Sequence, residues 1–551
     1  MQIGMKKPIF GAKAKTLALL VVSSFFSANL FAQTLPVGGL LPGMEDQLRR
    51  QQLLGRDSSG TSFMLRPLQL NNLIFNADTG AAGLSAAYFS KTLYQSANGK
   101  AAAYLLPVVW TSQFNSHHPF GSNDGSMIRS RGFQTQLSTG LYAKIGPLSV
   151  QLRPEVVFAQ NRDYRALSET GASYAGLYNR IDFPERYGTG SYTDVNWGQS
   201  SVRLTFDPVA IGISNENLWW GPGTHNSLLM SNNAAGFKHA TLNTSRPVQT
   251  AIGSFEGQII AGKLEASGYE LKGAGYRAKS QNWRYINAIT LTYQPKWIPN
   301  LYIGVDRSFY VYRKDMARSF KGYFPIFTAT LKKTITFVGE TENVTEEVVN
   351  QDQYFSAYAR WVLPEAKAEV YFQFGRNDFS YDMRDFMLEP ESSRAYIAGL
   401  RKLVALPQKD TYIQLGVELT QMQGSNTGTL RNQPNWYLHY VAAGYTNKGE
   451  IIGAAVGPES NQQTFEVSWV QGLKKIGLRF DHLNHNVALA KIVDGEKQYW
   501  SDLVFGGHFD WNYKNLIFNS QLNYIQSKNY QYLTKGESNL ALKLGIFYNF
   551  Q

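Results

Sequence analysis

The final segment of the chain alternates between two kinds of side chain. From residue 539 it reads NLALKLGIFYNF, with largely polar or small residues on one face and an apolar set on the other, namely Leu540, Leu542, Leu544, Ile546, Tyr548 and Phe550. A period of two over about a dozen residues predicts a strand with one apolar and one polar face. The length of this strand suits a tilted crossing of a lipid bilayer.

The same alternation recurs upstream, in AEVYFQFG from residue 368, YIQLGVELT from 412, TFEVSWV from 464 and IGLRFDHL from 476. A soluble β-sandwich also alternates, but its polar faces point outward to water and need no aromatic girdle. The chain has 32 Tyr, 32 Phe and 11 Trp, which fits the girdles of membrane strands. A barrel with lipid outside and a wet lumen also accommodates Lys367, Glu369, Arg479 and Asp481 without burying them unpaired. We predict an all-β, transmembrane antiparallel β-barrel in the bacterial outer membrane.

Chain length sets the expected size of this barrel. At roughly 25 to 30 residues per strand and connection, and with the even strand number that bacterial barrels prefer, we expect about 18 strands. A barrel of that width has an aqueous lumen unless something fills it. We assign residues 76–551 to the barrel.

Two segments precede the predicted barrel. Residues 1–32, with lysines followed by TLALLVVSSFF, are expected to be a secretory signal peptide. Residues 33–75 are expected to be a short periplasmic segment, helical and extended. Within it, GMEDQLRRQQLLGR at 43–56 has acidic residues in its first turn and arginines later, as a helix dipole favours. We expect this helix to pack on the periplasmic mouth, and a plain linker helix is the alternative. Beyond the signal, no run of about 18 apolar residues predicts a helical span.

The longest stretch without alternation runs from Asp306 to Gln353. Long loops of such barrels face the outside of the cell, so we expect an external loop here. Because it is rich in Tyr, Phe and Lys, it could fold inward and narrow the lumen. Residues 178–192 are a second candidate for such a loop.

Several classes of chemistry lack their sequence signals. The chain has no Cys and 8 dispersed His, with no HExxH, GxSxG, phosphate-binding loop or dinucleotide fingerprint. A serine triad can be drawn from Ser227 and His225, but a chain of this size always permits one. The formal charge of +12 is scattered along the chain, which does not suggest a nucleic-acid groove. We therefore expect no enzyme, no cofactor, no metal and no nucleic-acid partner.

One stretch, NLWWGPGTHNSLLMSNNAAGF at 217–237, combines aromatic and small polar residues. Pro222 between two glycines predicts a turn beside the two tryptophans. Aromatic faces suit the CH faces of sugars, and amides, hydroxyls and carboxylates suit their hydroxyl edges. We therefore predict glycan binding by Asn215, Glu216, Asn217, Trp219, Trp220, His225, Asn226, Ser227, Asn232 and Asn233. The alternative to glycan binding is a structural role, in which the tryptophans lie at the membrane interface and the polar residues form a loop in the lumen.

The sequence of this stretch also resembles that of a known protein family. Together with LNTSRPVQTAIGSFEGQIIAGKLE at 242–265 and the segment from residue 360 to 402, WWGPG and NSLLMSNNA resemble the Wzi family of capsule-assembly outer-membrane proteins, particularly its longer Bacteroidetes-type members. The resemblance implies an 18-stranded barrel, helices at the periplasmic end and a lectin-like role in holding capsular polysaccharide. The N-terminal helical part here is shorter than in enterobacterial members, at about one helix. No sugar-binding residues are transferred from the family.

Two functional readings follow. In the first, a monomer in outer-membrane lipid binds capsular polysaccharide or exopolysaccharide and attaches or assembles capsule at the cell surface, through many weak contacts. This reading predicts an occluded lumen. In the alternative, the barrel is a diffusion channel or polysaccharide exit pore, with Lys367, Glu369, Arg479 and Asp481 lining an open lumen.

Overall fold

The computed structural model describes residues 34–38, 42–57, 59–69, 91–170, 174–271, 275–328, 333–338, 341–346, 351–377, 387, 391–424, 435–493 and 495–550. The predicted signal peptide at 1–32 and the boundary at residue 76 lie outside these residues. The boundary between an N-terminal segment and the barrel therefore stays a prediction. No helix in the described part of the chain is long and apolar enough to cross a membrane.

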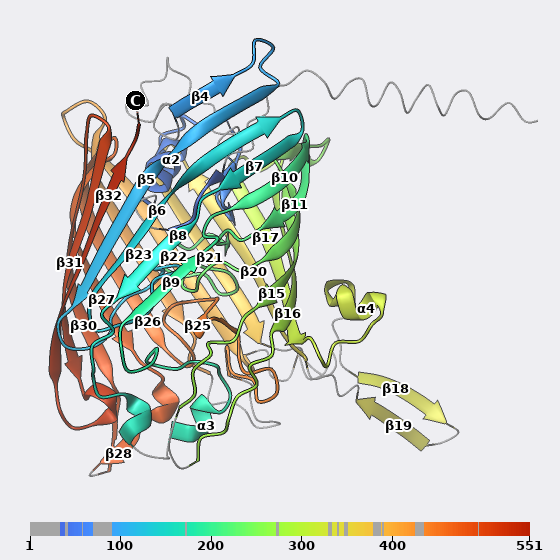
Figure 1. Ribbon diagram of the computed structural model, residues 1–551, viewed down its shortest axis with the longest axis vertical. Helices are drawn as coiled ribbons and strands as arrows, with labels where there is room; N and C mark the ends of the chain where they lie inside the picture. The colour runs from blue at the N-terminus through green and yellow to red at the C-terminus, as the bar shows by residue number, and fades with distance from the viewer. Residues whose placement is uncertain are drawn as a thin grey trace, which may run out of the picture.

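The wall is a single antiparallel sheet (Figure 1). Its first half contains β4 (Lys91–Gln95), β5 (Ala101–Asn115), β6 (Gly132–Ile145), β7 (Leu148–Leu152), β8 (Glu155–Ala159), β9 (Tyr192–Asn196), β10 (Ser201–Phe206), β11 (Val209–Ser214), β13 (His239–Thr244), β14 (Val248–Gln249), β15 (Gly253–Leu264), β16 (Arg284–Pro295) and β17 (Leu301–Tyr312). Its second half contains β20 (Gln351–Leu363), β21 (Ala368–Asn377), β22 (Arg394–Ala405), β23 (Thr411–Gln421), β26 (Asn461–Gln471), β27 (Lys474–Asn484), β30 (Ser501–Tyr513), β31 (Leu516–Lys528) and β32 (Glu537–Tyr548).

The sheet closes on itself, because β32 pairs with β5 from Ala541 opposite Asn115 to Tyr548 opposite Val108. The sheet has 22 described strands, of which β4 pairs only with β5. In three places two short strands follow one another along the same line of the wall, namely β7 and β8, β9 and β10, and β13 and β14. Counting each such pair once and setting β4 aside gives the 18 strands of a closed barrel. The predicted strand number is confirmed.

The apolar faces of the strands point outward. In β32, the outward-facing Leu540 and Leu544 are 44% and 46% exposed, whereas Asn539 on the opposite face of the same strand is 1% exposed. This is the reverse of a soluble protein and matches a wall that faces lipid. The alternation therefore predicted both the strands and the side that each face takes.

The two ends of the barrel differ in their connections. At the end with the C-terminus the strands are joined by short turns, such as the one between Ile145 and Leu148, and at the other end by long loops. In bacterial barrels the short turns are periplasmic and the long loops are external. The loops contain η4 (Leu167–Thr170), α3 (Ala175–Tyr178), α4 (Phe320–Tyr323), η6 (Pro325–Phe327), β18 (Lys333–Val338), β19 (Thr341–Glu346), β24 (Thr446–Asn447), β25 (Glu450–Ile451), η7 (Val487–Leu489), β28 (Lys491–Val493), β29 (Glu496–Gln498) and η8 (Tyr530–Tyr532).

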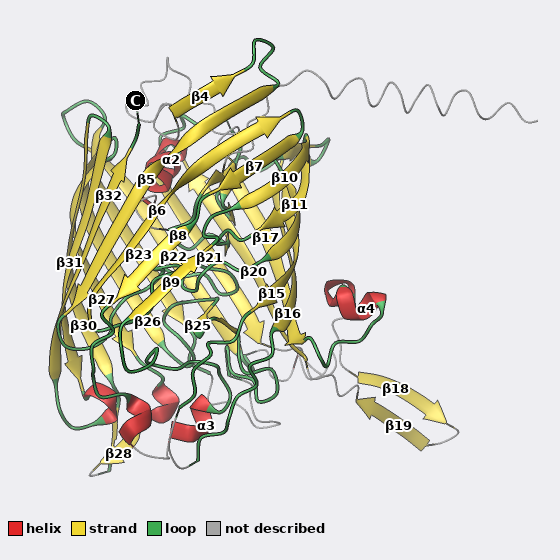
Figure 2. Ribbon diagram, in the orientation of Figure 1, coloured by secondary structure: helices red, strands yellow, loops and turns green. Residues whose placement is uncertain are grey.

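The N-terminal segment lies inside the barrel. It contains β1 (Thr34–Leu35), α2 (Pro42–Leu53), β2 (Leu65–Arg66) and β3 (Leu68–Gln69). Figure 2 shows that α2 lies inside the ring of strands, near the end with short turns, which is the periplasmic end. The predicted helix is confirmed, and it packs in the lumen through Met44 and Leu48 on one side and Leu53 on the other.

The external loop after β17 departs from the prediction. Regular strand continues through Asp306 to Tyr312, so the loop starts later than predicted. Residues 313–328 of this loop lie against the outer wall and do not enter the lumen (Figure 1). The second candidate does fold inward, because Ile181 packs in the buried cluster at the centre of the lumen.

Candidate functional site

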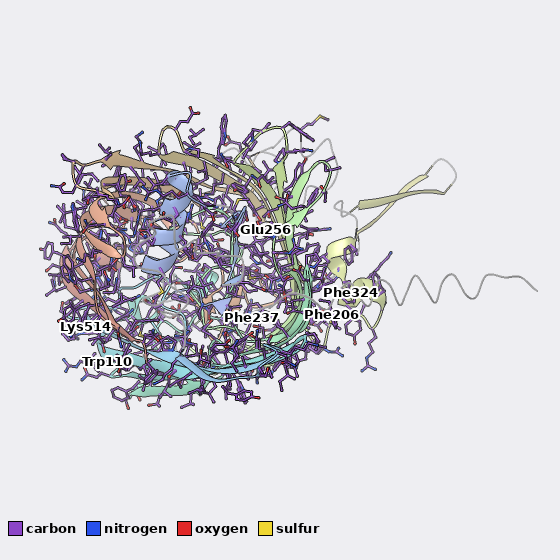
Figure 3. All side chains as sticks on the ribbon, turned by 90° about the horizontal axis from the view of Figure 1, so that it is seen from above. Trp110, Phe206, Phe237, Glu256, Phe324 and Lys514 are labelled. Atoms are coloured by element: carbon purple, nitrogen blue, oxygen red, sulfur yellow. The ribbon has the colours of Figure 1, made fainter. Side chains whose placement is uncertain are left out.

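A segment that we call the plug, residues 215–238, crosses the lumen. It leaves the wall at Ser214 and returns at His239, which face each other in the pairing of β11 with β13. Inside, β12 (Trp219–Trp220) pairs with β2 of the N-terminal segment. The chain then turns as predicted, with Gly221 at a φ of 101°, a conformation that favours glycine. Figure 3 shows side chains filling the interior of the ring of strands.

A carboxylate of the wall fastens the turn of the plug. Glu418 on β23 accepts hydrogen bonds from the backbone N–H groups of Thr224 at 2.7 Å, His225 at 3.1 Å and Asn226 at 2.8 Å. The hydroxyl of Tyr371 donates to the same carboxylate at 2.8 Å. Successive N–H groups aimed at one anion form a strong, charge-assisted contact. The turn is therefore held in one position.

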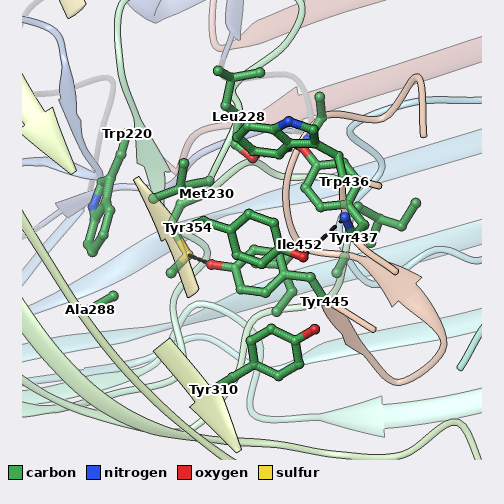
Figure 4. Packing of buried hydrophobic residues seen from close by; sticks show 14 of the residues in the cluster. Trp220, Leu228, Met230, Ala288, Tyr310, Tyr354, Trp436, Tyr437, Tyr445 and Ile452 are labelled. Atoms are coloured by element: carbon green, nitrogen blue, oxygen red, sulfur yellow. Dashed lines mark hydrogen bonds between the residues drawn. The ribbon is translucent and has the colours of Figure 1, made fainter. Parts of the chain in front are cut away.

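The apolar part of the plug forms a hydrophobic core inside the lumen (Figure 4). Leu228, Leu229 and Met230 are fully buried. They belong to one cluster with Trp436 and Tyr437 from the loop after β23, and the Tyr437 hydroxyl donates to the Leu228 carbonyl at 2.7 Å. Burying each such side chain contributes about 1.5–3 kcal/mol. The plug is thus a packed part of the fold.

The helix α2 is tied to the wall by buried ion pairs. Glu369 on β21 accepts from Arg49 at 2.9 Å and from Arg360 at 2.8 Å, and it lies 3.4 Å from Arg401. These four side chains are at most 5% exposed. Since Arg49 also donates to the carbonyl of Pro222 at 3.2 Å, the helix holds the plug as well as the wall.

A second set of charges surrounds Asp46 of the same helix. Its carboxylate pairs with Arg50 and Arg401 and lies 3.6 Å from Lys475. Burial acts to raise the pKa of Asp46, but these three cations outweigh it and hold that pKa well below its usual range. Asp46 therefore stays ionised, and its ion pairs persist at every physiological pH.

A cavity of about 560 Å³ remains between the plug and the wall strands β26 to β32 and β5. Several of its charged side chains are paired, as in Arg479 with Asp481 at 2.8 Å and Lys543 with Asp124 at 2.7 Å. Of the four residues predicted to line an open lumen, Arg479 and Asp481 line this cavity. The other two do not: Glu369 is buried in the ion-pair cluster, and Lys367 lies in the turn between β20 and β21.

The external end of this cavity, which we call the outer chamber, is rich in aromatic rings. Its rings stack on one another and on histidine, with Trp500 and His485 at 4.0 Å and Trp500 and Tyr530 edge to face at 5.1 Å. Asp502 fixes two of them, since it lies 2.7 Å from His485 and accepts from the Trp500 indole at 3.0 Å. The lining residues of the outer chamber are His118, Tyr164, Tyr178, His485, Asn486, Trp500, Tyr530, Gln531 and Tyr532.

Three buried polar atoms in this chamber have no hydrogen-bond partner among the described residues. They are Nε2 of His118, Oδ1 of Asn486 and Oε1 of Gln531, whose residues are 3%, 8% and 3% exposed. Burial lowers the pKa of His118 to about 4, so its ring is neutral at pH 7. An unsatisfied buried polar atom costs about 1–3 kcal/mol, so a hydroxyl group that reached one of these atoms would stabilise it.

The first predicted glycan-binding residues hold the start of the plug. Asn215 donates to the carbonyl of Gly198 at 3.1 Å, and Glu216 pairs with Arg203. Asn217 is 3% exposed and donates to a carbonyl further along the plug at 2.7 Å. Their polar groups are used within the protein.

The central predicted residues are also buried. The indole of Trp220 donates to Gln258 at 3.1 Å, and Asn226 donates to Gln462 at 2.9 Å. The hydroxyl of Ser227 is fully buried and donates to the carbonyl of Trp220, an arrangement unlike that of an accessible nucleophile. These contacts hold the turn together.

The remaining predicted residues lie closer to the cavity. Trp219, His225 and Asn232 line it, and the Trp219 indole N–H has no partner among the described residues. Asn233 instead donates to the carbonyl of Ile451 at 2.9 Å. Glycan binding by any of the predicted residues stays a prediction, and the structure brings three of them to the cavity.

The outer chamber itself was missed in the sequence. Its residues come from the segments after β5, β8, β27 and β31 and before β30, so no local motif joins them. The clusters HH at 117–118 and NYQY at 529–532 are the sequence signals by which it could have been found. No group of metal-binding residues occurs within the part of the chain that the structure covers.

Comparisons with known proteins fit this architecture. A family model described as "Capsule assembly protein Wzi" matches residues 113–539. A search of curated proteins finds no match. Among solved structures, the chain is similar to Wzi, described as an outer membrane protein involved in group 1 capsule assembly in Escherichia coli and as a carbohydrate-binding β-barrel. This match has a TM-score of 0.58 at 13% identity and covers 92% of this chain and 98% of that chain.

Two Acinetobacter baumannii structures show weaker likeness. OccAB4 matches with a TM-score of 0.38 and OccAB2 with 0.40, both at 10% identity. These matches cover 80% and 81% of this chain and 97% and 98% of the others. Because the family model spans most of the sequence, the chain belongs to the Wzi family of capsule assembly proteins, as a β-barrel of the bacterial outer membrane.

Proposed function

We propose that this barrel binds surface polysaccharide in the outer chamber, without catalysis, and so attaches capsule to the cell. The observation that carries the proposal is the chamber at the external end, where stacked rings lie beside buried polar atoms without protein partners. Sugars offer CH faces to rings and hydroxyl groups to polar atoms. The E. coli relative is described as a carbohydrate-binding barrel, which supports the same ligand class.

The inner part of the cavity extends this site. Trp219, His225 and Asn232 line this part and would contact a sugar that reaches past the chamber. Several weak contacts along one long polymer give firm attachment. We expect the protein to act as a monomer in outer-membrane lipid, with capsular polysaccharide or exopolysaccharide as its partner and no role for nucleic acid.

The alternative function, a diffusion channel or exit pore, has weaker support. Its support is the charged lining of the cavity, including Arg479 and Asp481. Against it stand the plug and α2, which occupy the lumen and are both fixed to the wall. We therefore expect the native barrel to pass little current across a planar bilayer.

Replacing Trp500 by alanine is expected to weaken polysaccharide binding roughly tenfold, because it removes a ring face worth about 0.5–1.5 kcal/mol beyond its buried area. Trp500→Phe keeps a ring and should retain most of the affinity. The measurement is surface plasmon resonance on the purified cell-surface polysaccharide of the source strain.

The matched control is Trp297→Ala, because Trp297 is 66% exposed in a periplasmic turn and far from the chamber. All variants should keep the heat-modifiable gel shift of a folded barrel. Equal affinity in Trp500→Ala and wild type would contradict a binding site in the outer chamber.

A further inference from the structure

A short external segment that we call the flap, residues 313–328, folds over the outside of the barrel. It follows β17 and contains α4 and η6. Figure 1 shows α4 beside the wall near β16, and Figure 3 shows Phe324 outside the ring of strands. The flap therefore lies on the side of the wall that faces the membrane.

The inner side of the flap is fastened to the wall. Arg307 of β17 donates to the carbonyls of Ile326 at 3.0 Å and Thr328 at 2.8 Å. The Tyr285 hydroxyl of β16 donates to the carbonyl of Tyr323 at 2.6 Å. These three hydrogen bonds fix the flap at a defined place on β16 and β17.

The position of the flap along β17 sets its depth. Ile303 and Val305 are 39% and 44% exposed on the outer face and belong to the lipid-facing belt. The next outward residues toward the external end are Arg307, which bonds to the flap, and Phe309, which is 2% exposed. The flap thus begins where the apolar belt ends, at the external boundary of the bilayer.

The outer side of the flap combines apolar rings with cations. Phe320 and Phe327 are 68% and 59% exposed, with nearly parallel rings 6.4 Å apart. Lys314, Arg318 and Lys321 are exposed, and no acidic side chain within the described residues forms an ion pair with them. Apolar rings beside unpaired cations are typical of segments that lie in a membrane interface.

We propose that the flap binds an anionic glycolipid of the outer leaflet, one that carries both acyl chains and phosphate groups. Phe320 and Phe327 would contact the acyl chains at the bilayer boundary, and Lys314, Arg318 and Lys321 would pair with the phosphates. An acidic polysaccharide without acyl chains fits less well, because it leaves the two exposed rings in water. The proposal concerns the outer wall and does not depend on sugar binding in the outer chamber.

The test is native mass spectrometry of the full-length protein in detergent, titrated with bisphosphorylated lipid A and with its dephosphorylated form. The variant K314Q/R318Q/K321Q removes the three cations. The control K296Q/K409Q/K514Q removes three exposed lysines from periplasmic turns. Each Lys or Arg near an anionic lipid surface contributes electrostatic attraction to it. The flap variant lacks three such cations and should bind bisphosphorylated lipid A at least about tenfold more weakly.

The expected result is phosphate-dependent binding that the flap variant loses and the control keeps. A second variant, F320S/F327S, should weaken binding while leaving the three cations in place. Equal binding of the phosphorylated and dephosphorylated lipids, or equal affinity in the flap variant and the control, would overturn the proposal. So would binding of an acidic polysaccharide at the flap in preference to the lipid.

Discussion

Replacing residues 215–238 by a short turn is expected to open a path through the barrel beside α2. Ser214 and His239 face each other across neighbouring strands, so a type I′ turn such as Asn-Gly can join the two strands without the plug. Barrels of about 16 to 18 strands are wide enough for an aqueous channel, and the plug forms much of the core that fills this one. Planar-bilayer recording should change from little current in wild type to a large, steady conductance.

The control for this experiment is a barrel with a full-length plug and a conservative change, Asn233→Gln, in which current should stay low. The heat-modifiable gel shift reports whether the shortened barrel is folded. A folded barrel that lacks the plug and still passes no current would show that the plug does not seal the lumen.

Replacing Glu369 by alanine is expected to destabilise the barrel by about 3–5 kcal/mol. This carboxylate compensates Arg49, Arg360 and Arg401, and all four side chains are buried. Without it, Arg49 and Arg360 lose their carboxylate partner, and only Arg401 keeps an ion pair, with Asp46. Thermal unfolding in detergent should show a markedly lower midpoint, and α2 should become sensitive to protease.

The matched control is Glu365→Ala, because Glu365 is exposed in the turn just before the same strand. Its midpoint should stay close to that of wild type. If Glu369→Ala unfolds at the wild-type temperature, the buried ion pairs do not hold the helix in the lumen.

The wall was predictable from the sequence because each strand faces two different solvents. Lipid selects Leu540 and Leu544 on one side, and the filled lumen selects Asn539 on the other, so the pattern reports both the strand and its orientation. The helix at 42–53 was predictable for a similar reason, since its charges follow the helix dipole.

The interior was harder to predict because its contacts join residues that are distant in the sequence. The composition of the plug suggested a sugar site, yet the same amides and indoles also satisfy a buried segment, as Trp220 does with Gln258. Local composition does not distinguish these uses, since both need hydrogen bonds beside apolar surface. The outer chamber is assembled from several external loops, and only the closed barrel brings His118, Trp500 and Tyr530 together.

The most direct test of polysaccharide attachment is the partition of surface polysaccharide between cells and medium. It compares strains that carry wild-type protein, Trp500→Ala with Tyr530→Ala, and the Trp297→Ala control, each with equal amounts of folded barrel. Attachment through the outer chamber predicts that the double variant makes polymer but sheds it into the medium, while the control retains it. Polymer that stays on the cells of the double variant at the wild-type level would contradict that role.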